Sequence, residues 1–192
     1  MIITLIPCGP SDWHSEGRLL GRVELAFTPQ AEAWVSAWVE RLRPLNLSRI
    51  LHAPDELARA TARLLGRRLG VPTRTVQDLK EVDLGLWAGL TDLQLRTRYA
   101  SAYRQLQEAP LSVCPPGGEE FAAAAERLRK FVQRLVRRNG RGGVGVVLRP
   151  VSLAIARYVL NGLDAARIWE DAWGQDEPVV VEYGAEAPAP GP

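Results

Sequence analysis

Short apolar runs alternate along the chain with longer amphipathic segments. Residues 2–6 form an apolar, β-branched run that ends at Pro7, which is typical of a strand buried on both faces. Similar short runs predict four more strands, at residues 49–53, 73–76, 144–148 and 178–183. Because amphipathic segments separate these runs, the pattern predicts an α/β fold.

Apolar residues at helical spacing predict the intervening helices. Thr28 as N-cap and Pro29 in the first turn open one helix, whose apolar face includes Trp34 and Trp38. We interpret both tryptophans as core residues, because such stripes are usually buried. Three further helices are predicted. One begins after the cap residue Asp55, the second covers residues 119–138 and the third covers residues 151–160.

This order of elements predicts a three-layer α/β/α sandwich around a mostly parallel sheet. We expect one domain over residues 1–183, with a lid-like insertion at about 88–118, and a disordered Ala/Pro/Gly-rich tail at 184–192. Ligands of such sheets bind at the carboxyl ends of the strands. The loops after Ile6, Leu51 and Val147 are therefore the candidate functional loops.

Composition narrows the possible partners and compartment. A chain of 192 residues with 46% hydrophobic content suits a single core. The net charge of +2 gives no overall basic face, so nucleic acid is not expected as a partner, and no apolar run is long enough to span a membrane. Two distant cysteines, Cys8 and Cys114, do not form a disulfide framework, which favours a reducing cytoplasm.

The candidate loops carry a series of motifs in a fixed order. These are Pro7-Cys8-Gly9-Pro10-Ser11 with Trp13-His14 and Gly17-Arg18, Phe27-Thr28, the block from His52 to Ala58 with Thr61-Ala62, the set Leu79, Glu81, Gly85, Trp87, Ala88 and Gly89, the run from Pro115 to Glu120, and Val147-Leu148-Arg149-Pro150. Their order and spacing resemble those of the histidine phosphatase superfamily, which has a phosphoglycerate-mutase-like fold. The resemblance covers nearly the whole chain, from Ile2 to about Gly162.

The resemblance implies a phosphoryl-transfer site from which most of the chemical groups are missing. The family uses a nucleophilic His, two Arg, a second His and an acid/base carboxylate, because a phosphoryl group needs cationic donors and an in-line attacker. At the matching positions, Cys8 replaces the nucleophile and Pro7 and Leu57 replace the two Arg. Arg149 replaces the second His, and only Glu81 is kept.

We therefore expect Cys8, Glu81 and Arg149 at the degenerate catalytic positions, with Arg18, His14, His52 and Leu57 at substrate-binding positions. We expect no metal and no cofactor, because the soft and hard ligands Cys8, His14, His52 and Glu81 lack any local ligand spacing. Glu81 is expected to be either a relic acid/base or the ion-pair partner of Arg149, and we favour the ion pair. Arg18 and Arg149 are candidates to hold a small anion or a phosphorylated metabolite.

Three functions compete at this point. The first is a catalytically inactive pseudoenzyme with a binding or regulatory role. The second is an active phosphatase or other hydrolase that uses Cys8 with His14 or His52. The third is a structural subunit that binds a protein partner, which an exposed tryptophan face around Trp169 and Trp173 would favour.

Overall fold

The structure is a computed structural model that describes residues 1–138, 142–162, 164–174 and 177–182. These residues form one five-stranded sheet in the order β3-β2-β4-β1-β5. The strands are β1 (Ile2–Pro7), β2 (Leu47–His52), β3 (Thr73–Thr75), β4 (Gly143–Leu148) and β5 (Val179–Glu182). The first four are parallel and β5 is antiparallel to β1, which confirms the predicted mostly parallel sheet.

The register of the central strands brings the candidate loops together. Pro7 of β1 lies opposite Leu148 of β4, and His52 of β2 lies opposite Val147. All six residues of β4 are buried, as are five of the six of β1, as expected for strands covered on both faces. The three loops that follow β1, β2 and β4 therefore leave the sheet at the same edge.

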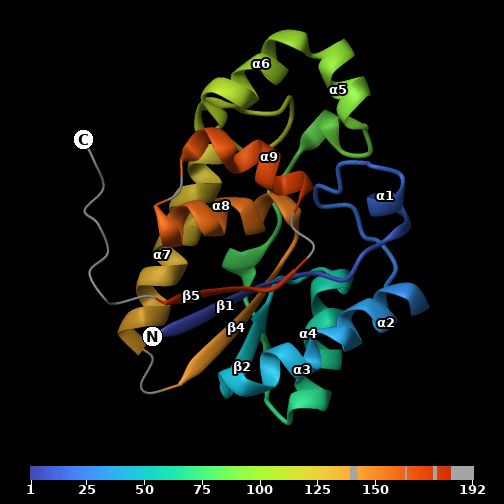
Figure 1. The fold of residues 1–192 in the computed structure, drawn as a ribbon. Coiled ribbons are helices and arrows are strands. Elements are labelled where there is room, and N and C mark those ends of the chain that lie inside the picture. The colour runs from blue at the N-terminus through green and yellow to red at the C-terminus, as the bar shows by residue number, and fades with distance from the viewer. Residues whose placement is uncertain (139–141, 163, 175–176, 183–192) are drawn as a thin grey trace.

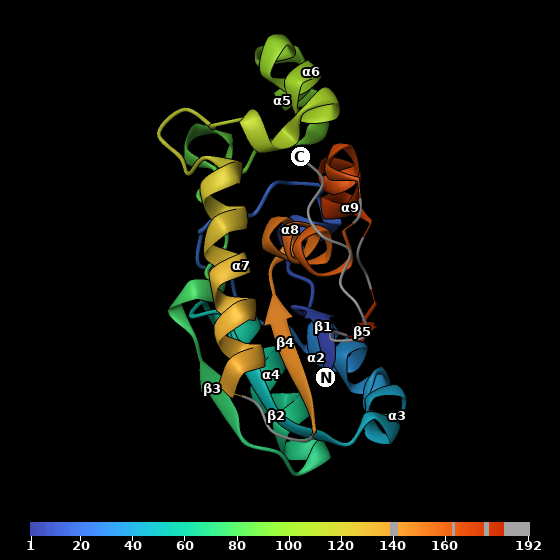
Figure 2. The same ribbon diagram turned by 90° about the vertical axis from the view of Figure 1, so that its left-hand side faces the viewer.

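Helices cover both faces of the sheet and complete the predicted sandwich (Figures 1 and 2). One face carries α7 (Phe121–Arg138), α8 (Pro150–Asn161) and α9 (Ile168–Trp173), and the other carries α2 (Pro29–Ala37), α3 (Val39–Leu42) and α4 (Glu56–Leu69). The predicted caps are present, since Thr28 accepts the amide of Ala31 and Asp55 accepts that of Ala58. A one-turn helix, α1 (Asp12–Ser15), lies in the loop after β1.

The prediction that both Trp34 and Trp38 are core residues is wrong for Trp34. The predicted helix divides into α2 and α3 at Trp38, which is buried, whereas Trp34 is 39% exposed. The buried positions of this segment are Ala31, Val35, Trp38, Val39 and Leu42, which form a stripe at helical spacing. Trp34 lies at the edge of that stripe, so its indole faces a cleft instead of the core.

Residues 88–118 contain two helices, α5 (Asp92–Arg98) and α6 (Ala100–Glu108), which lie beyond the carboxyl ends of the parallel strands in both views (Figures 1 and 2). Helix α6 contacts α9, and the role of this segment as a lid stays a prediction. The predicted tail at 184–192 lies outside the described residues. Within the described part of the chain, no helix is long and apolar enough to cross a membrane.

Candidate functional site

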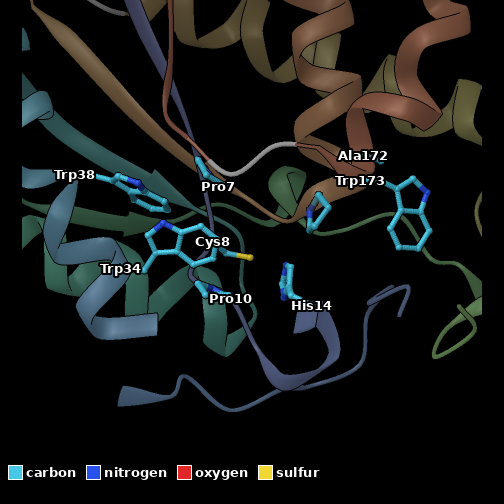
Figure 3. A pocket seen from close by; sticks show the side chains of 9 residues that line it. Pro7, Cys8, Pro10, His14, Trp34, Trp38, Ala172 and Trp173 are labelled. Carbon is cyan, nitrogen blue, oxygen red and sulfur yellow. The ribbon is translucent and has the colours of Figure 1, made fainter. Parts of the chain in front are cut away.

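A cleft opens at the carboxyl ends of β1 and β4. It consists of two adjoining pockets of about 360 Å³ and about 40 Å³ that share Pro10, His14, Trp34, Pro150, Ala172 and Trp173. Cys8 and Trp38 line the smaller pocket, and Arg18 and Glu81 line the larger one. Figure 3 shows the rings of Trp34 and Trp38 on one side of the small pocket and that of Trp173 on the other, with His14 between them.

The first loop places Cys8 at the floor of the cleft. The Cys8 amide donates to the carbonyl oxygen of Leu148 at 2.9 Å, and the Gly9 amide donates to Oγ1 of Thr61 at 2.8 Å. A Cβ atom at Gly9 would lie 2.7 Å from the ring of Phe27, so a side chain at this position would force that ring to shift. Cys8 is only 5% exposed, and this burial raises the pKa of its thiol. The thiol is therefore protonated at neutral pH, unlike a nucleophilic cysteine.

His14 projects into the cleft from α1 in a defined tautomer. Its Nδ1 atom lies 3.0 Å from the Ser11 amide, which can only donate, so Nδ1 accepts and the proton of the neutral ring is on Nε2. Desolvation and the neighbouring charge of Arg149 lower the pKa of His14 to about 4. At neutral pH His14 is therefore an uncharged hydrogen-bond donor, and its Nε2 has no lone pair for nucleophilic attack.

Arg149 lies beneath the cleft and does not line it. Its side chain is fully buried. Nη1 donates to the carbonyl oxygen of Val23 at 2.8 Å and is 3.9 Å from Oδ1 of Asp55. Among the described residues, Nε and Nη2 have no hydrogen-bond partner. Arg149 is thus an internal charge that the carboxylates of Asp55 and Glu81 help to balance.

The predicted ion pair between Glu81 and Arg149 is wrong. Within the described residues, no oxygen of Glu81 lies within ion-pair distance of the guanidinium, and its carboxylate instead accepts backbone amides. Oε1 accepts from Val82 and Ser152, both at 2.7 Å, and Oε2 accepts from Val151 at 3.1 Å. Burial raises the pKa of Glu81, an effect that Arg149 and these donors oppose. Glu81 therefore caps the N-terminus of α8, where a negative charge is favoured.

Side chains from three other segments hold the Glu81 loop in place. Nε of Arg22 donates to the carbonyl oxygen of Glu81 at 2.8 Å. Nη1 of Arg127 donates to the carbonyl oxygens of Asp78 and Lys80, and the hydroxyl of Ser152 also donates to Lys80. These bonds fix the loop to α7 and α8, so the position of the carboxylate is determined by tertiary structure.

The remaining predicted site residues lie in different environments. Arg18 lines the large pocket, but its guanidinium binds Glu16 and the carbonyl oxygen of Gly89. Leu57 is fully buried in the first turn of α4. His52 points away from the cleft, since Nδ1 lies 2.7 Å from the carbonyl oxygen of Ala53 and Nε2 lies 3.4 Å from the Thr75 hydroxyl. Burial also lowers the pKa of His52.

Sequence reasoning missed the apolar wall of the cleft. Pro10, Trp34, Pro150 and Trp173 line both pockets, and none of them was a predicted site residue. Pro10 and Pro150 belong to the matched motifs, which was an available signal. Trp169 is buried and Trp173 is half-buried, with ring centroids 5.8 Å apart in an edge-on arrangement, so these two residues do not form an exposed face.

The order of the strands and the position of the cleft define an α/β protein with its site at the carboxyl edge of a mostly parallel sheet. The model of the histidine phosphatase superfamily (branch 1) matches residues 3–189, so the chain belongs to that superfamily.

Similarity to individual members is distant but extends over most of the chain. Phosphoserine phosphatase 1 of Hydrogenobacter thermophilus is 22% identical over 167 residues, which cover 87% of this chain and 79% of that protein. Glucosyl-3-phosphoglycerate phosphatase of Mycobacterium tuberculosis is 28% identical over 165 residues, covering 85% and 74%. The solved structure of Bacillus stearothermophilus YhfR matches with a TM-score of 0.81 at 22% identity, covering 96% of this chain and 92% of that one.

Proposed function

We propose that this protein is a catalytically inactive member of the histidine phosphatase superfamily that keeps the cleft for binding. The proposal rests on the small number of cationic side chains that line the cleft. Among the described residues, Arg18 is the only Arg or Lys that lines the cleft, and its guanidinium is already bound by Glu16 and Gly89. Phosphoryl transfer depends on several cationic donors aimed at the transferring group.

The groups that remain in the cleft also lack a competent nucleophile. Cys8 is a buried thiol with a raised pKa, and His14 accepts a hydrogen bond on Nδ1 and carries its proton on Nε2. Glu81, which matches the acid/base position, is bound by three backbone amides. Loss of one such transition-state donor typically lowers the rate by roughly a hundredfold or more, and several positions differ here at once.

The proposal also includes a compartment and an alternative ligand. We place the protein in the cytoplasm, for which the two free cysteines are the support. The relatives are named as phosphatases of phosphoserine and of glucosyl-3-phosphoglycerate, which keeps a phosphorylated metabolite as the alternative ligand.

The test is an activity assay of the purified protein with p-nitrophenyl phosphate and 3-phosphoglycerate, beside an active superfamily member. We expect no turnover above the uncatalysed rate. Turnover that is abolished in the folded Glu81→Gln variant would refute the proposal in favour of the original chemistry. Turnover that is abolished by Cys8→Ala would refute it in favour of a hydrolase that uses the thiol.

A further inference from the structure

We infer that the cleft takes an uncharged aromatic ring compound carrying one hydrogen-bond acceptor, which contacts the indoles of Trp34 and Trp173 and the Nε2–H of His14. This inference rests on the proposed absence of catalysis and specifies the ligand class of the same cleft.

Flat apolar rings make up much of the cleft wall. Three indoles and three pyrrolidine rings line the cleft, from Trp34, Trp38, Trp173, Pro7, Pro10 and Pro150. Trp34 is 39% exposed, an unusual exposure for the largest apolar side chain. Flat apolar faces of this kind favour a flat apolar ligand, because ring stacking adds to the burial of surface.

The rings of Trp34 and Trp173 each pack against a buried ring. Trp34 packs on Trp38 with ring centroids 6.5 Å apart, and Trp173 packs edge-on against Trp169 at 5.8 Å. Trp38 and Trp169 are both buried, so each exposed wall is backed by a core residue. A preformed wall loses little conformational entropy when a ligand binds.

His14, Arg18 and Glu81, which line the cleft, are each either uncharged at neutral pH or already bound within the fold. His14 is neutral at pH 7, and Arg18 already donates from Nε to Glu16 and from Nη1 to the carbonyl oxygen of Gly89. Glu81 lines the large pocket with a carboxylate that is buried and held by amides. Arg149 is the residue that would most favour an anionic ligand, because its Nε and Nη2 have no partner among the described residues. These atoms are buried, however, and Arg149 lines neither pocket.

The cleft combines a small volume with a hydrogen-bond donor of fixed tautomer, the Nε2–H of His14. The larger pocket, at about 360 Å³, lies near the lower end of the roughly 300–1,000 Å³ found for small-molecule sites. A ligand of one or two rings fits that volume. The Nε2–H of His14 then orients it, in the way that a few polar groups orient ligands in mostly apolar pockets.

A set of probes that share one ring and differ in charge tests this inference. Ligand-observed NMR and tryptophan fluorescence would measure the binding of benzamide, benzoate, phenyl phosphate and benzylamine to the full-length protein at pH 7. We expect benzamide to bind at least about tenfold more tightly than the anions and the cation. Trp34→Ala should weaken benzamide binding by about tenfold or more.

The controls separate the cleft from the rest of the surface and one proposal from the other. Leu93→Ala removes an apolar side chain of α5 that is 71% exposed and lies outside the cleft, and it should leave benzamide binding unchanged. Trp34→Phe keeps an aromatic ring at this position and should retain most of the benzamide binding. It serves as the second variant if Trp34→Ala is misfolded. Any one of three results would overturn the inference. Phenyl phosphate could bind as tightly as benzamide, benzamide binding could survive Trp34→Ala, or no probe could bind at millimolar concentration. Hydrolysis of phenyl phosphate in the same samples would instead overturn the proposed absence of catalysis.

Discussion

Oε1 of Glu81 accepts the backbone N–H of Ser152 at 2.7 Å, so a carboxylate that matches an acid/base position serves as the cap of α8. The same carboxylate also accepts the amides of Val82 and Val151. A buried amide that loses its acceptor costs about 1–3 kcal/mol of stability. This contact gives the first prediction.

Glu81→Leu should lower the free energy of unfolding by at least about 1–3 kcal/mol, because it leaves these amides without their acceptor. Urea denaturation followed by circular dichroism would measure the change. Glu108→Leu, at the exposed end of α6, is the matched control and should change the free energy of unfolding by less than about 0.5 kcal/mol. An equal loss in both variants would show that Glu81 does not act as a cap.

Thiol reactivity should distinguish the two cysteines. Cys114 is exposed, whereas Cys8 is buried and burial raises the pKa of its thiol. We expect one thiol per chain to react with an aromatic disulfide reagent under native conditions and two to react after denaturation. Cys114→Ser should abolish the native reaction. A fast native reaction in Cys114→Ser would identify Cys8 as a reactive thiol and support the hydrolase alternative.

The lowered pKa of His14 gives a pH dependence of known sign. Its pKa is about 4 in the folded protein and 6.5 in the unfolded chain. Between these pH values the unfolded chain therefore binds more protons than the folded protein. Stability from this group is therefore present above pH 6.5 and is lost as the pH falls towards 4. His14→Gln keeps the capping box with Ser11 but does not titrate, so the difference in unfolding free energy between wild type and variant should rise with pH over this window.

That comparison isolates His14 from His52 and Glu81, since both of these titrate in wild type and variant alike. Thermal or urea unfolding at several pH values from 4 to 8 would measure it. A difference that is constant with pH would mean that His14 has an ordinary pKa.

Arg149 should control the protonation of His14 from beneath the cleft. Desolvation is the larger cause of the lowered pKa of His14, and the charge of Arg149 is the second. Arg149→Met should therefore raise the pKa of His14 from about 4 towards 6.5, and an NMR titration of the imidazole signals would detect the change.

Arg149→Lys keeps the charge and should leave the pKa of His14 low, while Arg167→Met removes an exposed charge and serves as the distant control. The same pKa in wild type and a folded Arg149→Met variant would contradict this coupling.

Local pattern was sufficient to predict most of the sheet and its helices. Apolar runs predicted the strands, because buried parallel strands are apolar on both faces, and Thr28 and Asp55 marked helix starts that the structure confirms. The exposure of Trp34 was not predictable from helical spacing, because it depends on where α2 gives way to α3 at Trp38.

The candidate site was predictable in position but not in its interactions. The motif positions led to the edge of the sheet at which Cys8, His14 and Glu81 line the cleft. Which partner each charge takes depends on distances across the fold. Glu81 binds amides that follow Pro150, and Arg149 binds a carbonyl oxygen 126 residues away in the chain. His52 belongs to a matched motif, yet its side chain faces β3.

The cap on α8 also limits what can enter the cleft. Pro150 supplies no N–H at the start of this helix, and the next two amides, of Val151 and Ser152, are both bound by Glu81. The protein thus carries a tethered competitor at a helix terminus that borders the cleft, and tethering gives such a group an effective concentration of at least about millimolar. To bind these amides, a free anion would have to displace the carboxylate of Glu81, which is part of the same chain and cannot diffuse away.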